Sequence, residues 1–336
     1  MSLSNLRPLV LLSLIWTVSP FPTAFAQEDP APDDVVNALE HISGVHTGLR
    51  RNHAKGVCAI GQFQASEAAR RLSFSALFSG QPISVVARFS VAGPNPSVSD
   101  AAKNPRGLAL QFQLPMGELH QMAMLNTPVF GAATPRSFYE RQLADAPDPA
   151  TGKRDPEKLK AYEAKFPESK AQTTWLAGHN PPPSYANVTF YSLHAFKFID
   201  ASQGEHWVKW RFEPRDGAQF LSDDELAKTP REFLAQRIVD RTRQAPIAWD
   251  MIVSLGEKGD PLDNPSVAWP AERGEIKAGT LTLTRAGEDT AATCEDINFD
   301  PNVLSAGVEP SPDPVLAYRS GAYAVSYSRR LDDKAK

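Results

Sequence analysis

The sequence has few cysteines and no excess of positive charge. Lysine and arginine total 35 residues against 39 aspartates and glutamates, which gives a formal net charge of −4. Without a global positive field the chain has little attraction for a polyanion, so a nucleic-acid partner is not expected. The two cysteines, Cys58 and Cys294, lack the CxxC spacing of redox or zinc sites. The chemistry of this protein therefore has to lie in other residues.

The first 26 residues have the pattern of a secretory signal. Arg7 gives the positive start, residues 9–18 form an apolar stretch, and Ala24-Phe25-Ala26 is a small-x-small cleavage site. This stretch is shorter than the ~20 residues of a membrane span. We therefore expect a mature chain that begins at Gln27, is exported to a bacterial periplasm and makes no membrane contact after cleavage.

Export allows disulfides, and here at most one can form within the chain. Cys58 and Cys294 both fall in predicted strands, so they can pair if those strands are neighbours. Alternatively, both are small buried side chains with no covalent link. The sequence leaves both possibilities open.

Eight segments have the alternating pattern and the β-branched or aromatic content of half-buried strands: 57–64, 83–91, 108–114, 187–199, 207–213, 248–255, 279–285 and 292–299. Helices are expected at 35–42, 134–143, 155–177, 222–243 and 313–331, the fourth of which begins at a capping box. This order favours an α+β chain built around an antiparallel barrel or sandwich. No linker divides residues 27–336, so we expect a single domain.

Two groups of polar residues are candidates for chemistry. Arg319 and Tyr323 are four residues apart and share one face of the last predicted helix. A guanidinium can hold a phenol as its phenolate, which makes the tyrosine a plausible metal ligand, although the same spacing is common on solvated helix faces. His53 stands among cations at the entrance to a strand, either as an acid–base group or as a surface residue.

Seven short motifs occur in a fixed order along the chain: RNHAKG (51–56), VARFSV (86–91), KNPRGLALQF (103–112), LNTPVF (125–130), INFDP (297–301), GVEPSPDPVL (307–316) and RSGAY (319–323). This set resembles the haem catalase family, and in particular its short, exported branch, the catalase-related peroxidases. The resemblance runs from about residue 46 to residue 331. It implies a catalase-like eight-stranded antiparallel β-barrel with surrounding helices and a C-terminal helix that carries the haem ligand.

The resemblance also implies roles for individual residues. His53, the histidine of HAKG, is expected to be the catalytic acid–base group on the distal side of the haem, and Tyr323 the ligand of its iron on the proximal side. Arg319 is expected to keep the phenol ionised. The other matches to the family's haem site are Arg50, Arg88 and Arg330 for the propionates, Ser90 near the distal histidine and, by spacing alone, Phe138 against the distal haem face.

One position departs from the family pattern. Full catalases have two successive asparagines before TP, the first of which positions peroxide, whereas this chain has Leu125 and then Asn126. Successive side chains of an extended segment face opposite ways, so Asn126 cannot replace the missing group without a register shift. The sequence also ends soon after the ligand helix, without the extensions of larger relatives. Both features predict a haem peroxidase that reduces hydrogen peroxide or organic peroxides with a small organic donor.

Several other functions remain open from the sequence. They are a true catalase that dismutates hydrogen peroxide, a hydroperoxide-rearranging relative such as allene oxide synthase, a non-catalytic haem-binding protein and a small-molecule-binding barrel without haem. The electron donor, the preferred peroxide and the oligomeric state are not determined by the sequence.

Overall fold

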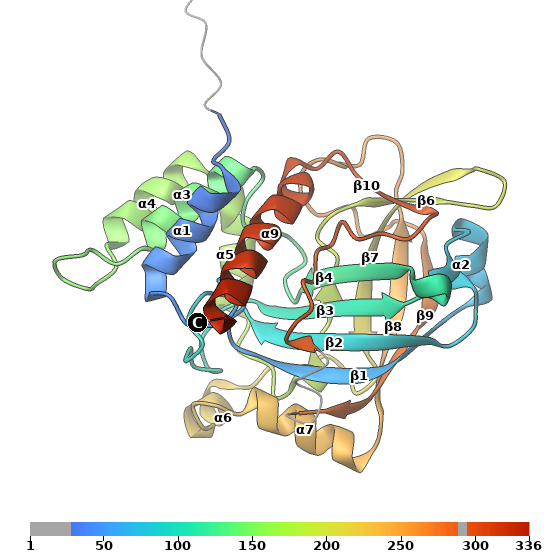
Figure 1. Cartoon of the computed structure of the whole chain (residues 1–336), viewed down its shortest axis with the longest axis horizontal. Coiled ribbons are helices and arrows are strands. Elements are labelled where there is room, and N and C mark those ends of the chain that lie inside the picture. Colours follow the sequence, from blue (N-terminus) through green and yellow to red (C-terminus); the bar gives the residue numbers. More distant parts are fainter. Residues whose placement is uncertain (1–27, 288–293, 336) are drawn as a thin grey trace, which may run out of the picture.

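The computed structural model describes residues 28–287 and 294–335, so the predicted signal peptide, residues 1–26, lies outside the described residues. One antiparallel sheet dominates the fold (Figure 1). Eight of its strands close into a ring because the last pairs with the first: β7 (Glu205–Pro214), β5 (Phe190–Tyr191), β4 (Leu119–Leu125), β3 (Arg106–Gln113), β2 (Ile83–Val91), β1 (Gly56–Ala65), β9 (Glu275–Ala286) and β8 (Ile247–Leu255). β6 (Phe196–Ile199) and β10 (Val308–Pro310) extend from β7. The predicted eight-stranded antiparallel barrel is confirmed.

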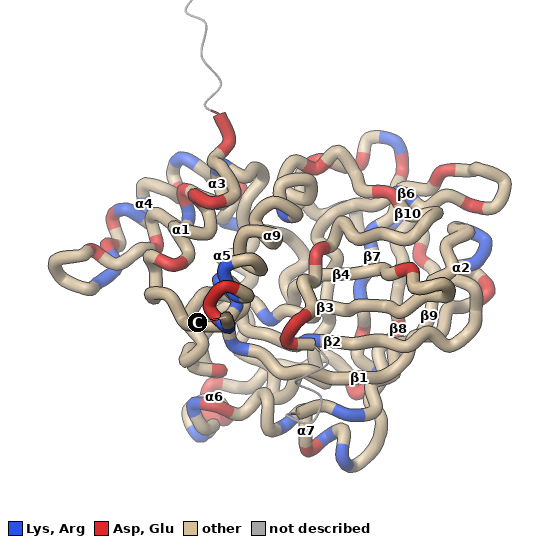
Figure 2. Tube along the Cα trace, in the orientation of Figure 1, with Lys and Arg blue, Asp and Glu red and all other residues tan. Residues whose placement is uncertain are grey.

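The helices of the described chain surround this barrel: α1 (Pro32–Ser43), α2 (Glu67–Leu72), α3 (Pro135–Asp145), α4 (Pro156–Lys165), α5 (Lys170–Gly178), α6 (Asp223–Lys228), α7 (Leu234–Gln244) and α9 (Pro314–Lys334). Figure 1 shows α9 crossing one side of the barrel, with α1, α3 and α4 beyond it, and α1 packs against both α9 and α3. None of the described helices is long and apolar enough to cross a membrane. Acidic and basic residues are interspersed over the outer elements (Figure 2).

Strand β2 is buried on both faces, and the two faces serve different purposes. Val85, Ala87 and Phe89 point into the main hydrophobic core. The alternate residues Arg88 and Ser90 are also buried, but they face the other way because side chains alternate along a strand. The outer face of the sheet is therefore covered, and the polar residues on it are held against a second layer.

Three predicted elements are interrupted in the structure. The helix expected at 155–177 is divided into α4 and α5 at Pro167, and the one expected at 222–243 into α6 and α7 around Pro230, because proline lacks the N–H that a continuous helix needs. The strand expected at 187–199 is divided into β5 and β6, with Leu193 at a positive φ of 64° between them. In each case a short local break overrides a longer periodic pattern.

The strand predicted at 292–299 is wrong for its described part, because residue 294 is helical and residues 295–299 form a turn and coil. Residues 292 and 293 lie outside the described residues. The first described residue of this segment, Cys294, nevertheless forms a disulfide with Cys58 of β1, with a Cα–Cα distance of 5.8 Å. The two cysteines therefore do pair, although Cys294 does not lie in a strand next to β1. The disulfide fixes residues 294–299 against the outer face of the sheet.

Candidate functional site

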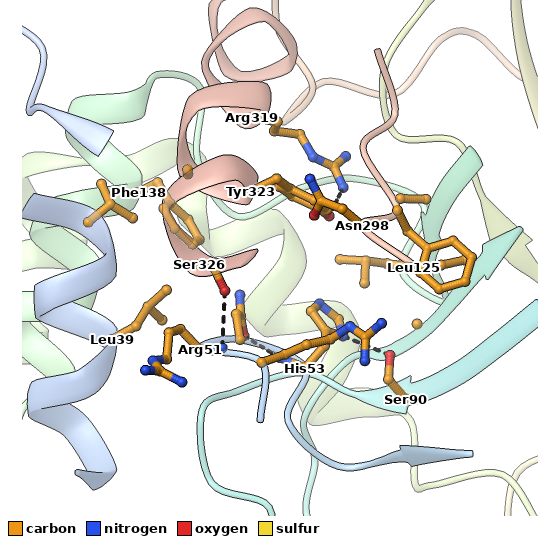
Figure 3. A pocket seen from close by; sticks show the side chains of 18 of the residues that line it. Leu39, Arg51, His53, Ser90, Leu125, Phe138, Asn298, Arg319, Tyr323 and Ser326 are labelled. Atoms are coloured by element: carbon orange, nitrogen blue, oxygen red, sulfur yellow. Dashed lines mark hydrogen bonds between the residues drawn. The ribbon is translucent and has the colours of Figure 1, made fainter. Parts of the chain in front are cut away.

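A cleft of about 1330 Å³, counted to its open mouth, lies between α1, α3 and α9 on one side and the outer face of β2, β3 and β4 on the other. The structure brings all the site residues predicted from the sequence to this one cleft: Arg50, His53, Arg88, Ser90, Phe138, Arg319, Tyr323 and Arg330. Figure 3 shows that Tyr323 and His53 project from opposite walls.

On the sheet side of the cleft, the strand register places small residues side by side. Gly107 of β3 pairs with Ser90 of β2 and with Leu125 of β4, and Ala109 pairs with Ala123. A Cβ on Gly107 would lie 2.6 Å from the Ser90 hydroxyl and 3.1 Å from the His53 ring. Gly107 is thus required for the close approach of these two side chains, and the small residues beside it leave room for a broad planar ligand.

His53 stands just before β1 with a positive φ of 54°, a conformation that L-residues adopt only when neighbouring contacts fix it. Its Nδ1 lies 2.9 Å from the Ser90 hydroxyl, and its carbonyl accepts a hydrogen bond of 2.9 Å from Arg88. Burial, together with the nearby Arg88, Arg319 and Arg50 guanidinium groups, lowers the pKa of His53 to about 3. The ring is therefore neutral near pH 7, and since Nδ1 contacts Ser90, Nε2 is the atom free to exchange a proton.

The opposite wall carries a hydrogen-bonded chain of four side chains. Arg319 donates to the Tyr323 hydroxyl at 2.6 Å and contacts Nε2 of His194 at 3.1 Å, while Nδ1 of His194 lies 2.6 Å from Asp313. Because a guanidinium can only donate, Nε2 of His194 must accept, so its Nδ1–H donates to the Asp313 carboxylate. Burial lowers the pKa of His194, which keeps this bridging ring neutral between the cation and the anion.

His194 and Asp313 were not predicted from the sequence. In the structure both are almost fully buried. Asp313 caps α9 by accepting from the backbone N–H groups of Val315 and Leu316, and the Asp-Pro pair at a helix start is a recognisable capping signal. His194 lies outside the seven motifs, in the segment between β5 and β6. No local signal marks it, because its role depends on a partner 119 residues away.

Three guanidinium groups crowd one end of the cleft. Burial and the like charges of Arg88 and Arg330 lower the pKa of Arg50 to about 9, and the raising effect of Glu295 does not outweigh them. Glu295 is 3.4 Å from Arg50, but Nε of Arg88 and both Nε and Nη1 of Arg330 are buried and have no hydrogen-bond partner among the described residues. Buried cations with free N–H donors are arranged to bind an anionic ligand.

Apolar side chains from α1 and α3 also line the cleft. Phe138 of α3 stacks on Phe130, with ring centroids 5.6 Å apart, and α1 contributes Val35, Val36 and Leu39. A ligand that fits this cleft therefore has a broad apolar body and an anionic edge.

Leu125 lines the cleft (Figure 3). Asn126 is not among the residues that line it. Asn126 is buried and its Oδ1 accepts a hydrogen bond of 2.7 Å from the backbone N–H of Arg106. The two residues thus face opposite ways, as expected for successive residues of an extended segment. Asn126 does not replace the group that Leu125 lacks.

Comparison with known proteins assigns the chain to a family. Residues 34–335 match the family model described as Catalase. The chain is 53% identical over 322 residues to the catalase-related peroxidase of Synechococcus elongatus, covering 96% of this chain and 95% of that protein. It is 29% identical over 300 residues to the catalase-related peroxidase of Mycolicibacterium paratuberculosis, covering 89% of this chain and 94% of that protein.

The solved structures show the same fold. A fungal catalase matches with a TM-score of 0.78 and 21% identity, covering 97% of this chain and 66% of that one. Catalase A of Saccharomyces cerevisiae matches with a TM-score of 0.77 and 23% identity, covering 85% of this chain and 62% of that one. The chain spans less than two thirds of the length of these solved catalases. The protein belongs to the catalase family.

Proposed function

We propose that this protein is a haem peroxidase that reduces hydrogen peroxide or organic peroxides with a small organic electron donor. The observation that carries the proposal is the cleft itself, in which a neutral His53 faces Tyr323 across a space lined by small residues of the sheet, apolar side chains and guanidinium groups. Family membership and the relatives named catalase-related peroxidase support the same conclusion.

The residues of the cleft fit a haem. Its two carboxylates would meet Arg50, Arg88 and Arg330, whose unpartnered buried N–H groups need acceptors. Its apolar ring would lie over the small residues around Gly107 and against Phe138. Tyr323 would hold the iron through its phenol oxygen, which accepts a hydrogen bond of 2.6 Å from Arg319.

A bound haem supplies the redox chemistry, because its iron accepts oxygen ligands and changes oxidation state. The chain's own residues supply proton transfer. His53 is neutral near pH 7, so its Nε2 can take a proton from one oxygen of a peroxide and return it to the oxygen that leaves. Ser90 holds the ring in place through Nδ1. Asp313 and His194 hold the guanidinium of Arg319 in place, and this guanidinium donates a hydrogen bond to Tyr323.

The test loads the purified protein with haem and compares wild type with His53→Ala and Tyr323→Phe. Wild type should bind haem and reduce peroxide while an aromatic donor is oxidised. His53→Ala should keep haem but lose roughly 10²–10⁴-fold in its reaction with peroxide. Tyr323→Phe should lose the phenolate contribution to the spectrum or the haem itself. Unchanged turnover in His53→Ala would remove the distal acid–base role, and oxygen release far exceeding donor oxidation would favour a catalase.

We also propose that the protein works in an oxidising compartment, after export directed by residues 1–26. The disulfide between Cys58 and Cys294 supports this, because such bonds persist in the periplasm and are rare in reducing cytosol. Periplasmic fractionation of cells that produce the tagged full chain tests it. A protein found uncleaved in the cytosol would contradict the proposal.

A further inference from the structure

Asn52 is the immediate neighbour of His53, and the orientation of its side-chain amide is fixed. Its Oδ1 accepts a hydrogen bond from the backbone N–H of His53 and another from the backbone N–H of Gly93, both at 2.9 Å. Backbone N–H groups can only donate, so the atom they contact must be the oxygen. The NH₂ group of Asn52 therefore points away from these two partners.

That NH₂ group is available to a ligand. Asn52 is one of the residues that line the cleft. Within the described residues its Nδ2 makes no hydrogen bond, and it is not sealed in the interior. An amide nitrogen that is held in place but not hydrogen-bonded offers a neutral donor to whatever occupies the cleft beside His53.

The oxygen of Asn52 has a separate role in holding His53. The positive φ of 54° at His53 is unfavourable for a residue with a side chain, so neighbouring contacts must fix it. Asn52 binds the N–H of His53, and Arg88 binds its C=O at 2.9 Å. Because Asn52 also binds Gly93, just after β2, it ties the His53 loop to the strand that carries Ser90.

Apart from the guanidinium groups assigned to the carboxylates, such as that of Arg88, the cleft beside His53 offers little else that can donate. Leu125 is apolar, Asn126 faces away, and the Ser90 hydroxyl is engaged with Nδ1 of His53. We propose that Asn52 holds His53 in its active conformation through Oδ1 and donates a hydrogen bond from Nδ2 to the peroxide. The donor role rests on the proposed function, whereas the holding role does not. Asn52 thus compensates in part for the donor that Leu125 lacks.

Two substitutions separate the roles. Asn52→Asp keeps an oxygen that can accept from both backbone N–H groups but removes the NH₂ donor, and Asn52→Ala removes both. Asn95→Asp is the matched control, because the Oδ1 of Asn95 also accepts a backbone N–H, that of Ser97 at 2.8 Å, on an exposed loop outside the residues that line the cleft. All three variants are compared with wild type.

The holding role is measured in haem-free protein by amide hydrogen exchange. Asn52→Ala should accelerate exchange at His53 and Gly93 by about tenfold or more, since each N–H loses its acceptor, while amides in the middle of β2 stay protected. Asn52→Asp and Asn95→Asp should leave both amides slow. If Asn52→Ala leaves exchange at His53 and Gly93 unchanged, Asn52 does not hold the loop.

The donor role is measured in haem-loaded protein as the second-order rate constant with hydrogen peroxide. Asn52→Asp and Asn52→Ala should both react about tenfold more slowly, which is the size of one lost hydrogen bond, and Asn95→Asp should match wild type. A rate within twofold of wild type for Asn52→Asp would overturn the donor role. If wild type itself fails to react with peroxide, the proposed function fails together with the donor role, and the exchange measurement still decides the holding role.

Discussion

The disulfide between Cys58 and Cys294 joins residues separated by 236 positions, so its removal has a calculable effect on stability. Both side chains are buried, and replacing both with alanine avoids placing new polar groups there. Cross-linking a loop of this length lowers the chain entropy of the unfolded state and stabilises the native state by roughly 5 kcal/mol. The double variant Cys58→Ala/Cys294→Ala should lose most of this stabilisation.

The loss of stabilisation corresponds to a decrease in melting temperature. With an unfolding entropy of about 2.1 cal/mol/K per residue over roughly 300 ordered residues, 5 kcal/mol corresponds to a decrease of about 8 °C. The site should also respond, because Arg50 donates to the backbone carbonyls of Cys294 at 3.0 Å and Ile297 at 2.9 Å, in the segment that the disulfide anchors. Weaker retention of haem is therefore expected in the variant.

Thermal unfolding followed by circular dichroism checks this, with and without a thiol reductant. The reductant should lower the melting temperature of wild type toward that of the double variant and leave the variant itself unchanged, which makes the variant the control for side effects of the reductant. A double variant that melts within about 2 °C of oxidised wild type would refute the reasoning. Such a difference corresponds to only ~1 kcal/mol, far below the stabilisation expected from the cross-link.

Three further predictions concern the cleft and the buried histidines. Asp313→Ala removes the cap of α9 and the partner of His194, so the free energy of unfolding should fall by about 2–4 kcal/mol in urea denaturation; an unchanged midpoint would show that the buried chain adds no stability. Leu125→Asn places an amide in the cleft and should raise the ratio of oxygen released to donor oxidised, measured with an oxygen electrode beside a donor assay; an unchanged ratio would mean that Leu125 does not limit dismutation. Burial lowers the pKa of His120 to about 3, and burial with nearby arginines does the same for His53, whereas the unfolded chain titrates near ~6.5. The free energy of unfolding should therefore be highest above pH ~6.5 and fall as the pH approaches 3, by up to about 1.4 kcal/mol per pH unit for each histidine. In His120→Asn the free energy of unfolding should fall less steeply with pH than in wild type. Equal slopes in the two proteins would show that His120 does not cause this pH dependence.

Much of the site could be predicted because its residues lie in short motifs whose structure is determined by neighbouring residues. Arg319 and Tyr323 meet because four residues make one turn of a helix, and Leu125 and Asn126 diverge because an extended chain alternates its side chains. Strand β2 coincides with the predicted range 83–91, since its β-branched residues leave little choice of structure. These features are decided within a few residues.

Other elements escaped prediction because their stability comes from distant partners. Strand β4 contains Met122, Ala123 and Met124, which have no preference for a strand, and it forms because β3 and β5 pair with it. The segment after Cys294 was expected to be a strand, but the disulfide and the contacts of Arg50 hold it as coil. Local propensity cannot anticipate contacts that arise only after the barrel closes.

The sequence by itself determined the kinds of groups present: a histidine among arginines, an arginine–tyrosine pair, and a leucine in place of an asparagine. Only the tertiary structure decided which of them face one another. Barrel closure and the docking of α9 set His53 opposite Tyr323, 270 positions later in the chain. They also connect His194 to Asp313 and place Asn52 where its Oδ1 accepts from the backbone N–H of Gly93. Each of these depends on long-range packing, which brings together residues that have no local reason to meet.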